Sequence, residues 1–187
     1  MRVIGGNLKG RRLFSPRWKG LRPTSDRLRE TLFDVLGNRI EGLRVLDGCA
    51  GTGALGIEAL SRGADHAVFI ERDARAVALI KRNLAHCALE RRSTVRRATI
   101  PHALRSPVPM PFDLVLLDPP YDAPDIGAIL TAAGTVMASD GLLIVERSRR
   151  CALPDVDGLK SQREVRAGNG VIEFYCAVAS VCKPATE

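Results

Sequence analysis

The spacing of apolar residues alternates between two patterns along most of the chain. Short apolar runs bounded by turn residues are typical of buried strands, and apolar residues three and four positions apart are typical of amphipathic helices. The apolar runs predict strands over residues 43–47, 67–70, 94–97, 114–117 and 142–145. The helical spacing predicts helices over residues 24–36, 54–62, 74–84 and 126–137. Because strands and helices alternate, we expect parallel strands with helices on both faces of the sheet.

The C-terminal part of the chain follows a different pattern. Residues 161–166 and 171–178 are strand-like runs on either side of the turn sequence Ala167-Gly-Asn-Gly170. Glycine and asparagine accept the positive φ of tight hairpin turns, so these runs predict an antiparallel pair. We therefore expect an α/β fold with a mostly parallel seven-stranded sheet and a C-terminal antiparallel hairpin. The expected domain covers residues 38–180, with a basic extension of residues 1–37 packed on it and a tail of residues 181–187.

The positive charge is concentrated near the N-terminus. The 187-residue chain has a formal net charge of +7. Its first 30 residues hold nine lysines and arginines against Asp26 and Glu30, and the charges of the remaining residues balance. A basic segment on a neutral body indicates a polyanionic partner, although a solvated basic tail would give the same pattern.

The composition argues against several classes of protein. No apolar run approaches the roughly 18 residues that a membrane span needs, and the N-terminal residues do not form a secretion signal. The five cysteines are scattered without a C-x-x-C pair, and the three histidines lack the spacing of metal ligands. We therefore expect a cytoplasmic monomer with no membrane partner, no disulfide framework and no bound metal.

A glycine-rich loop follows the first expected strand. Leu43-Arg-Val-Leu-Asp47 runs into Gly48-Cys-Ala-Gly-Thr-Gly-Ala-Leu-Gly56, where the second expected helix begins. The glycines at 51 and 53 allow the backbone to approach a ligand, and the start of the helix offers free N–H groups. Glycines 51, 53 and 56 also satisfy G-x-G-x-x-G, so a nicotinamide or flavin dinucleotide is an alternative ligand.

Two details favour S-adenosylmethionine over a dinucleotide. Gly51 comes four positions after Asp47, whereas the dinucleotide fingerprint begins as the strand ends. A carboxylate at Asp47 would also repel a pyrophosphate. The same carboxylate would attract the ammonium and sulfonium groups of the methyl donor.

Glu71 is expected to bind the ribose of that donor. It ends the strand 67–70 and should lie beside Asp47 at the carboxyl edge of the sheet, where two oxygens can accept both ribose hydroxyls. A surface glutamate paired with Arg72 is the alternative. After the next strand, backbone groups of Ala98 are expected near the adenine. The residues expected to bind the donor are Asp47, Cys49, Ala50, Gly51, Gly53, Glu71, Arg72 and Ala98.

The most specific motif is Asp118-Pro119-Pro120-Tyr121, which ends an almost wholly apolar strand and supplies the expected catalytic residues. Prolines cannot extend a sheet, so they force a rigid exit from the strand. An exocyclic base amine is a poor nucleophile because its lone pair is delocalised into the ring. Asp118, with the carbonyl of Pro119, could accept hydrogen bonds from such an amine and favour a pyramidal nitrogen. Tyr121 could stack on a base turned out of its surroundings.

These motifs together resemble those of the RsmD family, the bacterial 16S rRNA (guanine(966)-N(2))-methyltransferases. The resemblance covers residues 2–178. It is carried by Arg2-Val-Ile-Gly-Gly6, Gly20-Leu-Arg-Pro-Thr-Ser-Asp-Arg27 with its continuation to Phe33, residues 50–64, and Asp118 to Tyr121. The Arg22-Pro-Thr block and the run Glu58-Ala-Leu-Ser-Arg-Gly63 distinguish this family from other D-P-P-Y enzymes. One departure lies at Gly48-Cys49, where the family more often has a bulkier, frequently aromatic residue.

The resemblance implies the class I, Rossmann-like methyltransferase fold, with S-adenosylmethionine as donor and S-adenosylhomocysteine as product. It implies methylation of the exocyclic N2 amine of a guanine in 16S rRNA, within the 30S subunit or its precursor. It also suggests that the basic N-terminal segment holds RNA. The residues expected to contact RNA are Arg2, Lys9, Arg11, Arg12, Arg22, Thr24 and Arg27.

Other functions stay open on the sequence alone. An N6-adenine methyltransferase of DNA or RNA would also use D-P-P-Y, and the sequence does not reveal which groups read the base. A non-catalytic RNA-binding assembly factor could retain the fold, although it would not need Asp47, Glu71 and Asp118 together. A dinucleotide-dependent oxidoreductase is the third alternative.

Overall fold

The computed structural model describes residues 1–187 except 17, 19–25, 106–109, 121–122, 168–169 and 179–187. The expected helix start at Thr24, the hairpin turn at 168–169 and the tail of residues 181–187 lie outside the described residues. The helical elements are η1 (Gly6–Leu8), α1 (Asp26–Leu36), α2 (Ala54–Ser61), α3 (Ala74–His86), η2 (Glu90–Arg92), α4 (Ile100–Ala103) and α5 (Ile126–Gly134). The strands are β1 (Arg44–Gly48), β2 (His66–Glu71), β3 (Ser93–Arg97), β4 (Phe112–Leu117), β5 (Met137–Ser148), β6 (Leu159–Ala167) and β7 (Gly170–Ala177).

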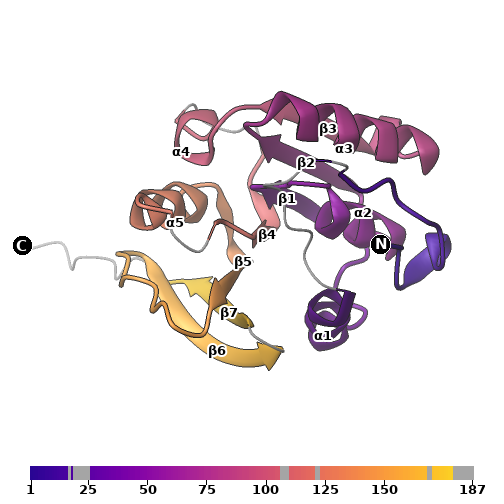
Figure 1. The fold of residues 1–187 in the computed structure, drawn as a ribbon. Helices are drawn as coiled ribbons and strands as arrows, with labels where there is room; N and C mark the ends of the chain where they lie inside the picture. Colours follow the sequence, from indigo (N-terminus) through magenta and orange to yellow (C-terminus); the bar gives the residue numbers. More distant parts are fainter. Residues whose placement is uncertain (17, 19–25, 106–109, 121–122, 168–169, 179–187) are drawn as a thin grey trace, which may run out of the picture.

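A seven-stranded sheet runs through the centre of the protein, in the order β3-β2-β1-β4-β5-β7-β6 (Figure 1). The first five strands in this order are parallel, and β7 is antiparallel to both β5 and β6. This arrangement confirms the expected α/β fold with its C-terminal antiparallel hairpin. It also brings the carboxyl ends of β1, β2 and β4 to one edge of the sheet.

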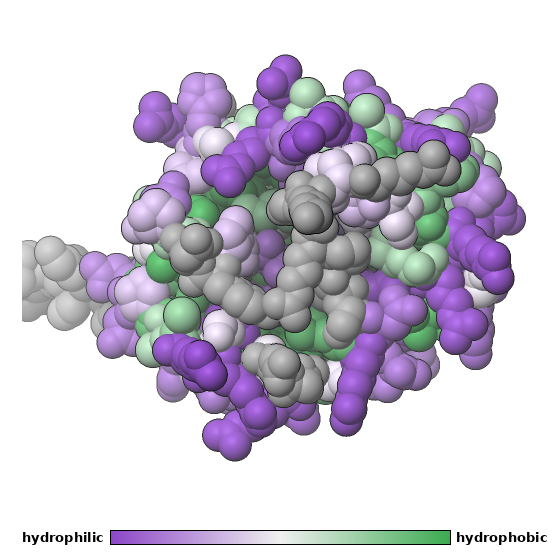
Figure 2. Space-filling model, in the orientation of Figure 1, coloured by the Kyte–Doolittle hydropathy of each residue, from purple (hydrophilic) through white to green (hydrophobic). Residues whose placement is uncertain are grey.

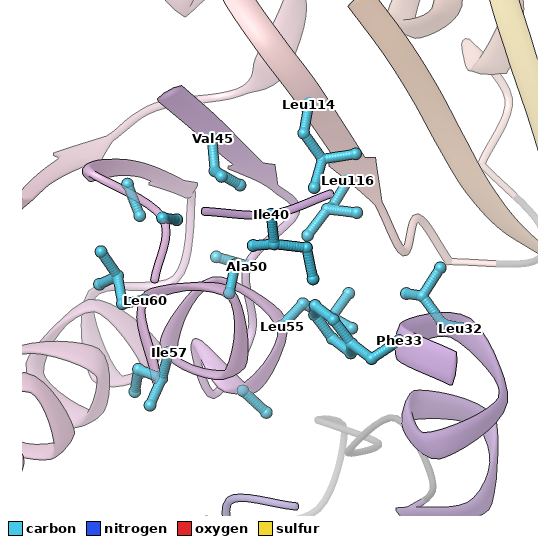
Figure 3. Packing of buried hydrophobic residues seen from close by; sticks show 14 of the residues in the cluster. Leu32, Phe33, Ile40, Val45, Ala50, Leu55, Ile57, Leu60, Leu114 and Leu116 are labelled. Atoms are coloured by element: carbon cyan, nitrogen blue, oxygen red, sulfur yellow. The ribbon is translucent and has the colours of Figure 1, made fainter. Parts of the chain in front are cut away.

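Both faces of the sheet are covered by helices. Leu114 and Leu116 of β4 belong to the apolar cluster under α1, α2 and α3, whereas Val115 and Leu117 belong to the cluster under α4 and α5. Figure 3 shows the first cluster, with Phe33 of α1 close to the residues of α2 and β4. Since alternate residues of a strand lie on opposite faces, burial on both sides explains why the parallel strands read as continuous apolar runs.

One local expectation from the sequence is wrong, and one short helix was not predicted. The helix expected over 126–137 ends at Gly134, and Met137 begins the long strand β5. Phe112 of β4 pairs with Met137, and its N–H donates to the carbonyl of Val136 at 2.9 Å. Pairing with β4 therefore ends the helix, although the spacing of apolar residues would allow it to continue. Helix α4 was not expected, because four residues are too few to produce a periodic pattern.

The N-terminal segment folds back on itself and packs against the domain. Arg2 and Arg12 form an antiparallel bridge, and the side chains of Val3 and Leu13, which follow them in the chain, are buried. Burying these apolar side chains holds the segment on the body of the protein. In Figure 1 the indigo N-terminal segment lies next to α2 and α3. The described part of this segment is therefore not a solvated tail.

A buried glutamate of α2 holds this segment in place. The carboxylate of Glu58 accepts hydrogen bonds from the N–H groups of Ile4 at 2.8 Å and Gly5 at 2.7 Å. It also pairs with Arg62 at 2.9 Å and lies 3.8 Å from the fully buried guanidinium of Arg29 in α1. Removing one partner of such a buried charge network is strongly destabilising. The Glu58-to-Gly63 motif therefore joins the N-terminal segment, α1 and α2.

Among the described residues, no helix has the length and apolar character needed to cross a membrane.

Candidate active site

Three acidic residues come together at the carboxyl edge of the sheet. Asp47 lies in β1, Glu71 ends β2 and Asp118 follows β4, and β1 pairs with β2 on one side and with β4 on the other. Asp47 and Glu71 are buried, and Asp118 is half-buried. Because these strands pair side by side, the three carboxyl groups share one edge of the sheet, and repulsion from Asp118 and Glu71 is among the causes that raise the pKa of Asp47.

Burial raises the pKa of Asp47 well above its ordinary value. A hydrogen bond from the N–H of Gly56 to Oδ2 of Asp47, at 2.8 Å, lowers the pKa of this carboxyl, while repulsion from Asp118 and Glu71 raises it further. Burial and negative neighbours disfavour the charged form, and a nearby positive charge favours it. A cationic ligand beside Asp47 would therefore be bound more tightly once this carboxyl is ionised.

The loop after β1 has the backbone conformation of a ligand-binding turn. Gly51 and Gly53 have φ values of 55° and 76°, in the left-handed region that glycine enters without strain. Cys49 also has a positive φ of 59°, which is uncommon for a residue with a side chain and is often found at functional sites. The N–H of Gly53 donates to the carbonyl of Ala50 at 2.7 Å, which closes the turn.

Glu71 fixes this loop from the neighbouring strand. Its Oε2 accepts a hydrogen bond of 2.8 Å from the N–H of Gly51, and its Oε1 accepts one of 2.8 Å from the N–H of Asp73. Each carboxylate oxygen has a second lone pair, so both can accept one more hydrogen bond. Arg72 is exposed. Glu71 is thus a buried acceptor that supports the loop, rather than a surface glutamate.

Close packing explains two glycines of this region. A Cβ on Gly56 would lie 2.4 Å from the ring of Phe69 and 3.1 Å from Oδ2 of Asp47, so α2 can approach the sheet only without a side chain there. A Cβ on Gly48 would lie 2.5 Å from Ile100 and 2.6 Å from Leu117. These two side chains fill the space beside Gly48.

The remaining residues expected at the donor lie around the same edge. Burial, followed by the charge of Glu71, raises the pKa of the Cys49 thiol to about 12, so this thiol is neutral at physiological pH. Ala50 is buried. The N–H of Ala98 donates to the carbonyl of Glu71 at 3.1 Å, which leaves its own carbonyl as the group that could face a ligand.

The segment after β4 leaves the sheet abruptly. Pro119 is buried, Pro120 is exposed, and the carbonyl of Pro120 accepts a hydrogen bond of 3.0 Å from the N–H of Ala123. Tyr121 lies outside the described residues. A hydrogen bond between Pro120 and Ala123 therefore holds the chain where it leaves the sheet, shortly after Asp118.

Near the end of β4 there is a small apolar hollow, with room for about one water molecule and with one acidic residue in its lining. Side chains from α1, α2, β4, β5 and β7 line it: Leu28, Leu32, Leu55, Leu116, Leu117, Ile144, Glu146 and Ile172. Leu117 of β4 pairs with Val145 of β5, so Asp118 and Glu146 follow paired residues on neighbouring strands. Glu146 was missed in the sequence. The signal was the one used for Glu71, an acid at the end of an apolar strand.

The residues expected to contact RNA lie on the surface where they are described. The exposed members of this set are Arg2, Lys9, Arg11, Arg12 and Arg27, whereas Arg22 and Thr24 lie outside the described residues. Arg27 lies in the first turn of α1, next to Leu28 at the hollow. Over the described parts of the chain, no group of three potential metal ligands comes together.

Comparisons with known proteins agree with this geometry. Residues 1–176 match the family described as "Conserved hypothetical protein 95". Ribosomal RNA small subunit methyltransferase D of Escherichia coli (strain K12) is 35% identical over 178 residues, which cover 94% of this chain and 89% of that protein. YlbH of Bacillus subtilis (strain 168) is 38% identical over 162 residues, which cover 84% of this chain and 88% of that protein.

Solved structures agree in the same way. YhhF of Escherichia coli superposes with a TM-score of 0.85 at 32% identity and covers 96% of this chain and 98% of its own. TrmN of Thermus thermophilus, at 20% identity and a TM-score of 0.68, shares the fold over 81% of this chain and 48% of its own. The chain therefore belongs to the RsmD family of methyltransferases, as its sequence motifs predict.

Proposed function

We propose that this protein transfers a methyl group from S-adenosylmethionine to the exocyclic N2 amine of a guanine in 16S rRNA, within the 30S subunit or its precursor. The observation that carries this proposal is the convergence of Asp47, Glu71 and Asp118 on one edge of the sheet, around a left-handed glycine loop. The rRNA substrate is supported by the relatives named small subunit methyltransferase D.

The residues of the loop fit the methyl donor. When bound, S-adenosylmethionine supplies an electrophilic methyl group on a sulfonium. The buried carboxyl of Asp47 suits the cationic amino acid end, because a positive charge favours its ionised form. The loop from Cys49 to Gly53 brings backbone groups close to the ligand, and both oxygens of Glu71 have a lone pair left for the ribose hydroxyls. The carbonyl of Ala98 would face the adenine.

Asp118 would act on the base amine. Its carboxylate, together with the carbonyl of Pro119, would accept hydrogen bonds from the two amine hydrogens and direct the nitrogen lone pair away from the ring. The same acceptors stabilise the positive charge that develops on the nitrogen, and the proton that is lost passes to the carboxylate or to water. The turn closed by Pro120 and Ala123 keeps these acceptors in one position, and Tyr121 would stack on the base.

Glu146 favours guanine over adenine as the base beside Asp118. A carboxylate can accept a hydrogen bond from the N1–H of guanine, whereas adenine has an acceptor at N1. Glu146 lines the hollow on the strand next to Asp118. Glu146 could therefore hold the N1–H of the guanine while Asp118 and Pro119 hold its N2 amine.

The direct test is to incubate the protein with labelled S-adenosylmethionine and 30S subunits that lack its modification, then to digest the rRNA and identify the labelled nucleoside. We expect the label in N2-methylguanosine of 16S rRNA. Label in N6-methyladenosine would move the base assignment to the adenine alternative. Donor binding without any label in rRNA would contradict the proposed substrate.

A further inference from the structure

The chain has a second basic region, whose positive charge is offset by acidic residues elsewhere in the sequence. Residues 72–105 hold nine lysines and arginines against Asp73 and Glu90, so this stretch has a net charge of +7. Acidic residues before and after it cancel this charge in the total, which is why the sequence suggested a neutral body. The expectation that all of the net charge lies in the first 30 residues is therefore correct for the total charge, but it does not describe how the charges are distributed along the rest of the chain.

The structure places this second region against the N-terminal segment. Helix α3 has three exposed cationic residues, Arg75, Lys81 and Arg82, and no acidic residue. Asn83, which is fully buried, accepts a hydrogen bond of 2.8 Å from the N–H of Phe14 and donates one of 3.2 Å to its carbonyl. The N-terminal segment is thereby attached to α3, and the two basic regions lie side by side.

Aromatic rings order the arginines of this surface. The guanidinium of Arg82 lies 3.6 Å from the centre of the Phe14 ring, and that of Arg75 lies 5.2 Å from the centre of the Trp18 ring. Arg11 donates a hydrogen bond of 3.1 Å to the carbonyl of His86 at the other end of α3. A guanidinium stacked on a ring is held in one orientation, so less entropy is lost when Arg82 binds a phosphate, whereas two nitrogens of Arg75 already donate to Asp73.

This surface leads to the donor site. Arg75 lies in the first turn of α3, shortly after Glu71, and pairs with Asp73, whose N–H binds that same glutamate. Asn83 also donates a hydrogen bond of 3.1 Å to the carbonyl of Thr52 in the donor loop. Hydrophilic residues gather along the upper rim in Figure 2, where α3 lies in Figure 1.

We propose that these residues form a binding track for the sugar–phosphate backbone of the RNA, and we name it the α3 stripe: Arg11, Phe14, Trp18, Arg75, Lys81 and Arg82. The inference rests on the proposed function, since it assumes that the substrate is RNA. Gathering cations on a helix without acids raises their mutual repulsion, which a polyanion relieves. Because phosphate contacts are independent of sequence, the α3 stripe positions the RNA, while Asp118 and Glu146 select the base.

The test compares two double variants with equal loss of charge. Lys81→Gln with Arg82→Gln removes two cations from the α3 stripe. The control, Arg163→Gln with Arg166→Gln, removes two exposed cations from β6 at the opposite edge of the sheet. The affinity for a 16S rRNA fragment that contains the methylated region is measured over a series of KCl concentrations. Each lost phosphate contact lowers the slope of log affinity against log salt by about 0.7 to 0.9.

We expect the α3 variant to bind RNA about ten-fold more weakly, with a salt slope reduced by about 1.5, and the β6 control to keep the wild-type slope. A wild-type slope in the α3 variant would overturn the α3 stripe while leaving the proposed function intact. If the wild type neither bound nor methylated rRNA, the proposed function itself would be contradicted.

A further variant separates charge from packing. Arg82→Met keeps an apolar side chain over Phe14 and removes only the cation. Its midpoint of urea unfolding and its Kd for S-adenosylmethionine should match those of the wild type. The slope of log RNA affinity against log salt should be reduced by about half as much as in the double variant. An unchanged salt slope in this stable variant would exclude Arg82 from the RNA contact.

Discussion

The N–H of Gly51 donates a hydrogen bond of 2.8 Å to Oε2 of Glu71. The other oxygen of this buried carboxylate accepts the N–H of Asp73, so one side chain of β2 fixes both the donor loop and the start of α3. The conformation of the loop therefore depends on Glu71 even before a ligand is bound. This double role separates Glu71 from Asp118, which follows β4 and would act on the base.

Replacing Glu71 with alanine should weaken donor binding. The change removes the acceptors for the ribose and for the Gly51 N–H, and charged hydrogen bonds contribute about 1.5–3 kcal/mol each. We expect the Kd for S-adenosylmethionine to rise at least about ten-fold in calorimetry, while the exposed Glu90→Ala control stays near the wild type.

An analogue isolates the ribose contact from the loop contact. The wild type should bind S-adenosylhomocysteine more tightly than its 2′,3′-dideoxy derivative, because the derivative lacks both ribose hydroxyls. In Glu71→Ala this preference should largely disappear. The same preference in both proteins would mean that Glu71 supports the loop without touching the ribose.

Replacing Asp118 with alanine should stop turnover without preventing donor binding. An acid or base in contact with the reacting group contributes about 10²–10⁴-fold to the rate, so we expect a loss in that range under saturating donor. The Kd for S-adenosylmethionine should stay within a few-fold of the wild type. Asp125→Ala, which removes an exposed acid from the same loop region, is the matched control. Substantial activity in the Asp118 variant would contradict the assigned mechanism.

Glu146→Gln should relax the recognition of the base. A neutral carboxamide accepts the hydrogen bond from the guanine N1–H more weakly than a carboxylate does, and its NH₂ group opposes that N–H when the amide is turned the other way. We expect kcat/KM for methylation of 16S rRNA to fall about ten-fold or more, since a hydrogen bond to a charged group contributes about 1.5–3 kcal/mol. The Kd for the donor should not change.

The specificity of Glu146 can be checked with 2-aminopurine at the target position. This base keeps the N2 amine and lacks the N1–H, so the wild type should methylate it poorly compared with guanine. Glu146→Gln should lose much of that difference. A variant that discriminates as strongly as the wild type would show that Glu146 does not read the base.

Asp47 should make stability and donor affinity respond to pH in opposite directions. Its pKa is raised above the ordinary value of 3.8, mainly by burial, so the folded protein holds this proton more tightly than the unfolded chain does. Its contribution to folding is fully present below the ordinary pKa and is lost as the pH rises through the raised one. Donor affinity should instead increase with pH over the same range, because the cationic ligand favours the carboxylate.

The variant Asp47→Asn tests both effects. Its amide oxygen can still accept the hydrogen bond from Gly56, and the cost of burying a charge is absent. At pH 8 we expect it to resist urea better than the wild type and to bind S-adenosylmethionine more weakly. Both differences should shrink toward pH 4. A variant less stable than the wild type at pH 8 would show that the carboxylate is stabilised by contacts other than the one with Gly56.

The parts of the structure that were predictable from the sequence have local signals. The strands that carry Asp47 and Asp118 are apolar runs with an acid at the end, and the parallel sheet then brings these acids together. The position of Glu58 could not be predicted, since its partners Ile4 and Gly5 lie 54 and 53 positions away. A glutamate on a helix with mostly apolar neighbours does not show which distant backbone groups it will meet.

Other features were missed because the sequence signal was ambiguous or averaged out. The sequence pattern near Met137 is compatible with both a helix and a strand, and the strand forms because Met137 pairs with Phe112 of β4. The positive charge of α3 was not noticed because acidic residues elsewhere in the chain cancel it in the total. The arginines of α3 also stack on Phe14 and Trp18, which come from a different part of the chain. Long-range packing thus decided both cases.

A last prediction concerns Gly48, one of the two residues, Gly48 and Cys49, at which the sequence is expected to depart from the RsmD pattern. A Cβ there would meet Cδ1 of Ile100 at 2.5 Å and Cδ2 of Leu117 at 2.6 Å. Overpacking of this kind costs about 1–3 kcal/mol, so Gly48→Ala should lower the free energy of unfolding by that amount. Ile100→Val removes the nearer methyl and by itself should cost about 0.5–1.5 kcal/mol through the space it leaves. In the double variant the new methyl occupies that space, so the two losses should not add, with a coupling of at least about 0.5 kcal/mol measured by urea unfolding. Because Leu117 still crowds the site, we expect partial recovery. Strict additivity would mean that Ile100 does not fill the space beside Gly48.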